Sequence, residues 1–103
     1  MKIQFSESAF NDLEKIQEYY GDQGVPHIGI NFVAEIIAHV ETLLDNPKIG
    51  RIVPEFNSED IRELIHIPFR VVYTIESKKI HIVRVWRSER LLKLAGTSND
   101  DEI

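Results

Sequence analysis

One segment limits the possible folds more than any other, and it reads IRELIHIPFRVVYTIESKKIHIVRVWRSERLL from residue 61 to residue 92. Apolar, β-branched and aromatic residues dominate this segment, and Pro68 and Ser77 interrupt it. Short apolar runs bounded by turn residues indicate successive β-strands. We therefore expect strands at about residues 60–66, 69–76 and 79–86, and their short connections make them antiparallel.

Several arginines lie within this apolar segment, which the core of a sheet does not require. They are Arg62, Arg70, Arg84, Arg87 and Arg90. Because guanidinium groups bind carboxylates and phosphates well, the cluster indicates a negatively charged partner. Any single arginine can instead pair with a nearby acid, and both roles stay open; the candidate acids are Glu55, Glu59, Glu63 and Glu89.

The last two predicted strands are apolar on both faces, since alternate residues of a strand point to opposite sides of the sheet. On the strand at 69–76, one face is expected to carry Phe69, Val71, Tyr73 and Ile75. On the strand at 79–86, one face is expected to carry Ile80, Ile82, Arg84 and Trp86, and the other His81, Val83, Val85 and Arg87. Helices can cover one face of the sheet. The other face is therefore expected to be an apolar surface that binds a partner.

The first half of the chain predicts a short strand followed by two helices. Residues 2–5 alternate in polarity, and Ser6 is a good N-cap for a helix that ends near Gly21. Pro26 suits the first turn of a second helix, which is expected to end at Asn46 because proline follows. The short turn at residues 21–24 makes the two helices an antiparallel hairpin.

These elements together predict an α+β fold of order β-α-α-β-β-β. An N-terminal strand and an antiparallel α-hairpin pack on a small antiparallel β-sheet, and a short helix or coil follows the last strand. With 103 residues the chain has room for a single domain, which we place at residues 1–94. Residues 95–103, AGTSNDDEI, are expected to form a disordered acidic tail.

Composition excludes several classes of site. The chain has no cysteine, which excludes disulfides and thiolate metal sites, and its 4 histidines lack a metal-binding spacing. We expect no metal and no cofactor, and the sequence contains no nucleophile motif or phosphate-binding glycine motif. The apolar runs are shorter than a membrane span, so the expected compartment is the cytoplasm.

Charge is divided unevenly along the chain, whose net charge is −5. Acids outnumber bases in residues 1–46, whereas bases outnumber acids in residues 48–93. This asymmetry indicates that the sheet half meets a negatively charged partner, although an unevenly charged solvated surface also explains it. The negative total argues against a general nucleic-acid binder.

Several pieces in a fixed order resemble the RelE/ParE superfamily of bacterial toxins. They are FSESAFNDLEKI at the start, NPKIGR after the second helix, and then REL, FRVVY and IVRVWRSER. The resemblance covers about residues 1–94 and implies a helical hairpin on a small antiparallel sheet. It also implies one of two activities: ParE-like members inhibit DNA gyrase, and RelE-like members cut mRNA on the ribosome.

Within that resemblance, the positions that carry function in the nucleases favour the ParE-like branch. The nucleases place lysines on the strand before FRVVY and an acid–base group near the C-terminus, where this chain has Ile61, Glu63 and Leu94. Arg70 does match a nuclease arginine that contacts phosphate. The acidic composition also differs from that of the strongly basic nucleases.

The resemblance therefore implies a ParE-like toxin of a type II toxin–antitoxin module, neutralised by a cognate antitoxin and acting on DNA gyrase by binding. Such a toxin has no catalytic residue, meets DNA only through the antitoxin, contacts no membrane and serves plasmid stabilisation. Target binding is expected at Arg84, Trp86, Arg87, Arg90 and Lys93. Phosphate or acidic-partner contacts are expected at Arg62, Arg70 and Tyr73, and antitoxin contacts at Phe69, Val71, Ile80 and Ile82.

Two alternatives stay open. The first is a ribosome-dependent mRNA interferase that uses Arg70, Arg87 and a histidine. The second is a non-toxic family member that only binds an antitoxin. Growth, DNA supercoiling and mRNA integrity, followed together after expression of the chain alone, separate these alternatives from a gyrase inhibitor.

Overall fold

The computed structural model describes residues 1–87 of the chain. In chain order the elements are β1 (Lys2–Phe5), α1 (Glu7–Asp22), α2 (Pro26–Glu41), β2 (Arg51–Ile52), β3 (Ile61–His66), β4 (Phe69–Ile75) and β5 (Lys79–Arg87). Two short 3₁₀ turns, Thr42–Leu44 and Pro47–Ile49, join α2 to β2. The helix or coil expected after the last strand and the tail expected at 95–103 lie outside the described residues.

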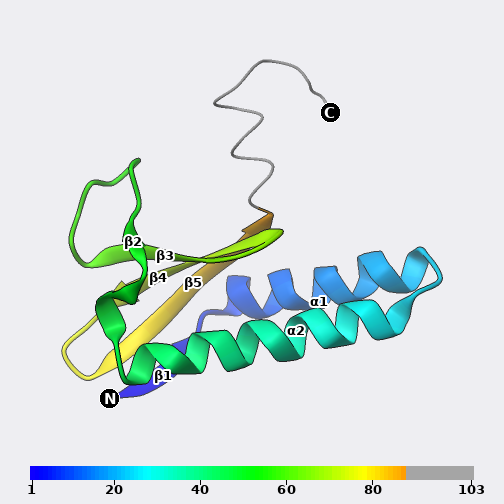
Figure 1. Ribbon diagram of the computed structural model, residues 1–103, viewed down its shortest axis with the longest axis horizontal. Helices are drawn as coiled ribbons and strands as arrows, with labels where there is room; N and C mark the ends of the chain where they lie inside the picture. The colour runs from blue at the N-terminus through cyan, green and yellow to red at the C-terminus, as the bar shows by residue number, and fades with distance from the viewer. Residues whose placement is uncertain (88–103) are drawn as a thin grey trace.

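The molecule has two layers, with the α1–α2 hairpin lying along one side of a five-stranded sheet (Figure 1). The strand order is β1-β5-β4-β3-β2, in which β1 runs parallel to β5 and the other neighbours are antiparallel. Parallel pairing needs a long connection, which the intervening elements provide. The predicted α+β fold is confirmed, with a mixed sheet in place of a wholly antiparallel one.

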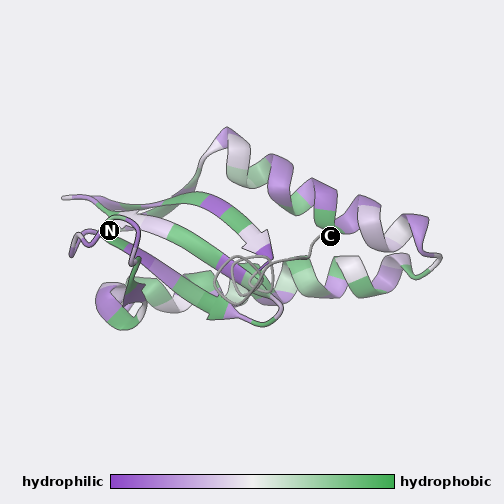
Figure 2. Ribbon diagram, turned by 90° about the horizontal axis from the view of Figure 1, so that it is seen from above, coloured by the Kyte–Doolittle hydropathy of each residue, from purple (hydrophilic) through white to green (hydrophobic). Residues whose placement is uncertain are grey.

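Local sequence signals set the limits of the two helices. Ser6 precedes α1, and its Oγ accepts a hydrogen bond from the Ala9 N–H at 2.9 Å. α2 begins at Pro26 as predicted but ends at Glu41, before the predicted end at Asn46. The chain tightens there into 3₁₀ turns, which are common at the C-termini of α-helices. At the end that carries the turn between α1 and α2, the hairpin extends beyond the strands (Figures 1 and 2).

The core lies between the hairpin and the covered face of the sheet. It includes Leu13, Ile16, Ile36, Val40 and Leu43 from the helical layer and Leu64, Phe69, Val71, Tyr73, Ile80, Ile82 and Val85 from the strands. None of these side chains is more than 8% exposed. Because burial of each large apolar side chain contributes about 1.5–3 kcal/mol, this layer is the main source of stability.

One helical stretch of 19 residues, Pro26–Leu44, is long and apolar enough to cross a membrane by length and composition alone, with a mean hydropathy of 1.2. The core helix of a soluble protein passes the same test. Ile36 and Val40 of this stretch are fully buried in the core beneath the sheet. Burial in the core therefore accounts for part of the apolar character of α2, while Ile30 and Ile37 of the same helix are exposed.

β2 is not among the strands that we expect from the sequence. It has only two residues, and they pair with β3 through Arg51–Glu63 and Ile52–Arg62. Two residues are too few to give a period-two pattern in the sequence. So short a strand at the edge of the sheet also offers little to other chains for pairing.

A β-bulge in β5 interrupts the regular alternation of that strand. Tyr73 pairs with Ile82, whereas the preceding Val72 pairs with Arg84, so Val83 is the extra residue. An inserted residue of this kind reverses which face each later side chain takes. The faces predicted for the strand at 79–86 therefore hold only as far as Ile82.

Beyond the bulge, Val85 and Arg87 take the helix-covered face, because they pair with core residues of β4. Arg84 and Trp86 take the opposite side of the sheet, which we call the outer face. The prediction that these two share a face with Ile80 and Ile82 is wrong. Figure 2 shows apolar and hydrophilic residues following one another along the strands. The pattern of the sequence gives no sign of the bulge.

Candidate partner-binding site

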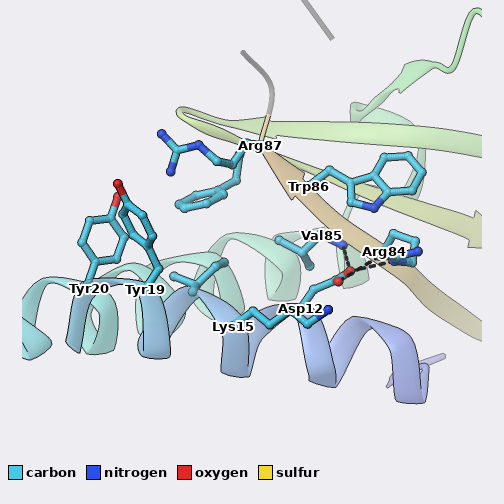
Figure 3. Close-up of a pocket in the computed structure, with 10 residues that line it drawn as sticks. Asp12, Lys15, Tyr19, Tyr20, Arg84, Val85, Trp86 and Arg87 are labelled. Carbon is cyan, nitrogen blue, oxygen red and sulfur yellow. Dashed lines mark hydrogen bonds and ion pairs between the residues drawn. The ribbon is translucent and has the colours of Figure 1, made fainter. Parts of the chain in front are cut away.

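A groove with a volume of about 500 Å³ lies between α1 and the end of β5 (Figure 3). Its lining includes Lys15, Tyr19 and Tyr20 from α1 and Arg84, Trp86 and Arg87 from β5. β1 pairs with β5 only as far as Ile82, so α1 flanks the edge of β5 beyond that point. We call this site the β5 groove. It combines aromatic rings, cations and the edge of a strand.

Asp12 of α1 fixes the geometry at one end of the β5 groove. Its Oδ2 accepts hydrogen bonds from Arg84 Nε at 2.8 Å and from the Val85 N–H at 2.9 Å, and its Oδ1 accepts one from Arg84 Nη2 at 3.0 Å. The hydrogen bonds that Arg84 donates to Asp12 raise the pKa of Arg84 above its ordinary value. A carboxylate that is only 7% exposed thus joins α1 to β5 and orients one guanidinium.

Trp86 lies on the outer face between two guanidinium groups. Arg70 and Arg84 lie 5.4 and 5.1 Å from the centre of its ring, which are cation–π distances. On the other side of β5, Arg87 lies 5.7 Å from the Phe69 ring and 6.0 Å from the Tyr19 ring. The structure therefore brings together Arg84, Trp86 and Arg87 of the predicted target surface, while Arg90 and Lys93 lie outside the described residues.

A buried ion pair occupies the outer face next to Trp86. Glu63, whose side chain is fully buried, is bonded by Arg51 and lies 2.7 Å from Arg70 Nε, and the Arg70 side chain is 4% exposed. Within residues 1–87, neither Glu63 Oε1 nor Arg70 Nε has an aligned hydrogen-bond partner, so this short contact is a charge contact. Glu55 lies 3.9 Å from the other side of Arg70.

Tyr73 and Arg62 support the backbone on either side of β2. The Tyr73 hydroxyl donates to the Pro47 carbonyl at 2.6 Å and accepts from the Gly50 N–H at 3.1 Å, and burial raises the pKa of Tyr73. Arg62 donates to the carbonyl oxygens of Gly50 and Glu59, each at 2.9 Å. Both side chains thus have structural partners at the positions where contacts with phosphate or an acidic partner are expected.

The four residues expected to contact an antitoxin lie in the protein's own core. They are Phe69, at 2% exposure, and Val71, Ile80 and Ile82, each at 0%. The helical hairpin covers the face of the sheet that carries them, because this face supplies the apolar surface on which the hairpin packs. They offer no surface to a partner in this conformation.

Sequence reasoning missed the residues that α1 contributes to the β5 groove, among them Asp12, Lys15 and Tyr19. Their neighbours on α1 form the apolar stripe of an amphipathic helix, and in the sequence these three residues lie outside that stripe. One signal was present, since Asp12 lies between the buried residues Ala9 and Ile16 at helical spacing. A carboxylate in that position needs a buried partner, and Arg84 is that partner.

One protein family and two solved structures are similar to this chain. The sequence model of the family described as the ParE toxin of the type II toxin–antitoxin system parDE matches residues 3–92. No curated protein sequence matches the chain.

Two solved structures are similar. The chromosomal ParDE toxin–antitoxin system from P. aeruginosa gives a TM-score of 0.72 at 25% identity, over 84% of this chain and 95% of that one. YafQ from E. coli strain BL21(DE3) gives a TM-score of 0.53 at 15% identity, over 86% and 94%, and shows likeness of fold alone. Because the family match spans nearly all of the strands and helices described above, the chain belongs to the ParE toxin family of type II toxin–antitoxin systems.

Proposed function

We propose that this ParE-type toxin inhibits growth by binding DNA gyrase, that it does so without cutting RNA, and that a cognate antitoxin neutralises it. The family match and the similarity to a ParDE system support the toxin and its antitoxin partner. The target and the absence of RNA cleavage are inferences from the site itself.

The burial of Arg70 and its contact with Glu63 support the proposal that the protein does not cut RNA. A nuclease of this fold needs reachable cations to bind the scissile phosphate and groups to move protons. Arg70 is the retained cation, but it is 3% exposed and lies against the carboxylate of Glu63. Ile61 and Glu63 stand at the positions of the nuclease lysines and supply no replacement. Arg70 is thus engaged in an internal ion pair and is not available to bind phosphate.

The end of β5 supplies a surface better suited to docking a protein. The Arg84 side chain is 38% exposed and Trp86 is 36% exposed, and they stack on each other beside the β5 groove. Tryptophan and arginine are the residues that most often anchor protein interfaces. We place target binding at this surface, and we propose that the antitoxin covers the same surface and so blocks the target.

Expression of the full chain alone tests this function. We expect growth to stop, plasmid supercoiling to change and translated mRNA to stay intact in primer extension. The variants Trp86→Ala and Arg87→Glu should remain folded and lose most of the growth inhibition. Lys78→Glu makes the same charge change as Arg87→Glu in the remote turn between β4 and β5, and it should remain toxic.

Two results would redirect the assignment. Discrete cuts within codons that disappear in an Arg70→Ala variant would make the protein an mRNA interferase. Normal growth with intact mRNA and unchanged supercoiling would make it a family member that only binds an antitoxin.

A further inference from the structure

We propose that the edge of β5 in the β5 groove is a strand-addition site, which takes an extended peptide segment carrying carboxylates and uses Asp12 as a removable cap. The inference rests on the proposed function, since it describes the segment through which a partner such as the antitoxin would cover the target surface. The partner segment is an extended chain in which acidic and apolar residues alternate.

The edge of β5 is capped by side chains in place of a neighbouring strand. The Ser6 N–H donates to the Ile82 carbonyl at 2.9 Å, and this is the last backbone bond that continues β1 along β5. The Ser6 Oγ donates to the Val83 carbonyl at 2.8 Å, and Asp12 accepts from the Val85 N–H at 2.9 Å. Side-chain caps of this kind protect an edge and can be exchanged for the backbone of a partner.

The carboxylate of Asp12 occupies the place that a strand carbonyl would take. In an antiparallel or parallel ladder, the N–H and C=O of one residue point to the same side of the strand. The carbonyl of Val85 therefore faces the β5 groove together with the N–H that Asp12 binds. An added strand that replaced Asp12 Oδ2 at this N–H would gain a regular pair of backbone bonds.

The charges of the β5 groove favour an acidic segment. Asp12 is the one carboxylate among the described lining residues, and Arg84 already neutralises it, whereas Lys15 adds a further positive charge. Lys15 is exposed and has no ion-pair partner within residues 1–87. A carboxylate on the partner can bind Lys15 or replace Asp12 at Arg84, so that displacement of the cap leaves no guanidinium unpaired.

The walls of the β5 groove fit the alternating geometry of a strand. Tyr19 and Tyr20 stand together at one end of it (Figure 3), and Phe69 is also a lining residue. Successive side chains of an extended segment point to opposite sides. Apolar side chains can therefore pack on these rings while acidic ones on the other side of the segment meet the cations.

Titration with two synthetic peptides on the full chain tests the proposal. The first is a blocked pentapeptide of alternating valine and glutamate, and the second carries lysine in place of glutamate. We expect the glutamate peptide to shift the backbone amide resonances of Val85 and Arg87 and to slow exchange of the Val85 amide. The lysine peptide should leave these resonances unchanged at the same concentration.

Charge variants locate the binding. Lys15→Glu should weaken the glutamate peptide by about fivefold, the upper range for a single exposed ion pair. Lys78→Glu, which makes the same change far from the β5 groove, should have no effect. Asp12→Asn keeps an acceptor for the Val85 N–H but releases Arg84 from its charge partner, so it should bind the glutamate peptide more tightly.

Three outcomes would overturn the proposal: equal binding of both peptides, shifts confined to another strand edge such as β2, or self-association of the chain that occupies β5. Because Lys15 is exposed, its variant reports on binding even if Asp12→Asn fails to fold. Peptide binding is measured without gyrase, so a toxin with a different target would leave this result intact.

Discussion

Glu63 is a fully buried carboxylate held between the guanidinium groups of Arg51 and Arg70. In Glu63→Gln, both arginines lose their charge partner, and Arg70 cannot reach water because its side chain is 4% exposed. Removing one partner of a buried ion pair costs about 3–5 kcal/mol. We expect a loss in the free energy of unfolding towards the lower part of that range, because Glu55 remains near Arg70. Urea unfolding measures it.

Glu14→Gln is the matched control for this prediction. Glu14 is exposed on α1 and makes no ion pair within residues 1–87, so the same chemical change should alter stability by less than about 0.5 kcal/mol. Equal effects of the two variants would show that the Glu63 ion pair contributes nothing to stability.

His39 and His66 form a contact between α2 and β3 that predicts a pH dependence. Their Nδ1 atoms lie 2.9 Å apart, and burial, followed by the charge of His66, lowers the pKa of His39 below its ordinary 6.5. The unfolded chain then takes up a proton at a higher pH than the folded chain. Stability should be greatest above this ordinary pKa and fall as the pH drops from there towards the lowered folded value.

Unfolding in urea at a series of pH values, from about 7.5 to about 5.5 across the histidine range, checks this sign. The variant His39→Gln should show a flatter dependence, and His27→Gln, at an exposed position of α2, should behave as the native chain does. Stability that rises on acidification would contradict the stated pKa of His39.

At the residue scale, the sequence shows which charged residues the candidate site contains, but it does not show which acid pairs with which arginine. The presence of arginines in the strands is evident from the sequence, and so is their possible pairing with Glu55, Glu59 or Glu63. Which acid meets which arginine depends on strand register. Register in turn depends on the bulge at Val83 and on the two-residue β2, and neither has a sequence pattern of its own.

At the element scale, the close approach of the two helices depends on Gly29. A Cβ added there would lie 3.0 Å from the Gln17 Cα and 3.2 Å from the Ile16 carbonyl oxygen, both backbone atoms of α1. The variant Gly29→Ala must therefore push the helices apart, and we expect a loss of about 1–3 kcal/mol, the usual cost of overpacking. Thermal and urea unfolding measure this loss.

Gly21→Ala is the control, because nothing lies within 4 Å of a Cβ at Gly21. This position belongs to α1, where alanine is preferred to glycine by about 0.5–1 kcal/mol, so the variant should be unchanged or more stable. A Gly29→Ala variant as stable as the native chain would mean that the hairpin is not closely packed at this point.

The helices and the three long strands were predictable, because each has a periodic apolar pattern longer than one turn or one pleat. Ser6 and Pro26 mark the starts of the two helices, and Pro68 marks the turn between β3 and β4. The β5 groove was not predictable in the same way, since it forms where α1 replaces β1 beside β5 beyond Ile82. Such a junction depends on the relative lengths of elements that are far apart in the sequence.

At the scale of the whole molecule, the charge asymmetry of the sequence has a structural counterpart. The acidic half forms the helical layer, and the basic half forms most of the sheet, in which the end of β5 brings Arg84 and Arg87 to the β5 groove. If partner binding uses these charges at the rim of an aromatic surface, added salt should slow association more than it speeds dissociation. Stopped-flow binding at two salt concentrations measures both rates.

We propose that this ParE-family protein acts on gyrase through the end of β5 and does not act on RNA. The most direct measurement is supercoiling of a relaxed plasmid by purified gyrase, with the full chain added at increasing concentration. We expect the native chain and Lys78→Glu to inhibit supercoiling equally, and Arg87→Glu to inhibit it far less while keeping its fold. Undisturbed supercoiling at every concentration of native protein would contradict the account.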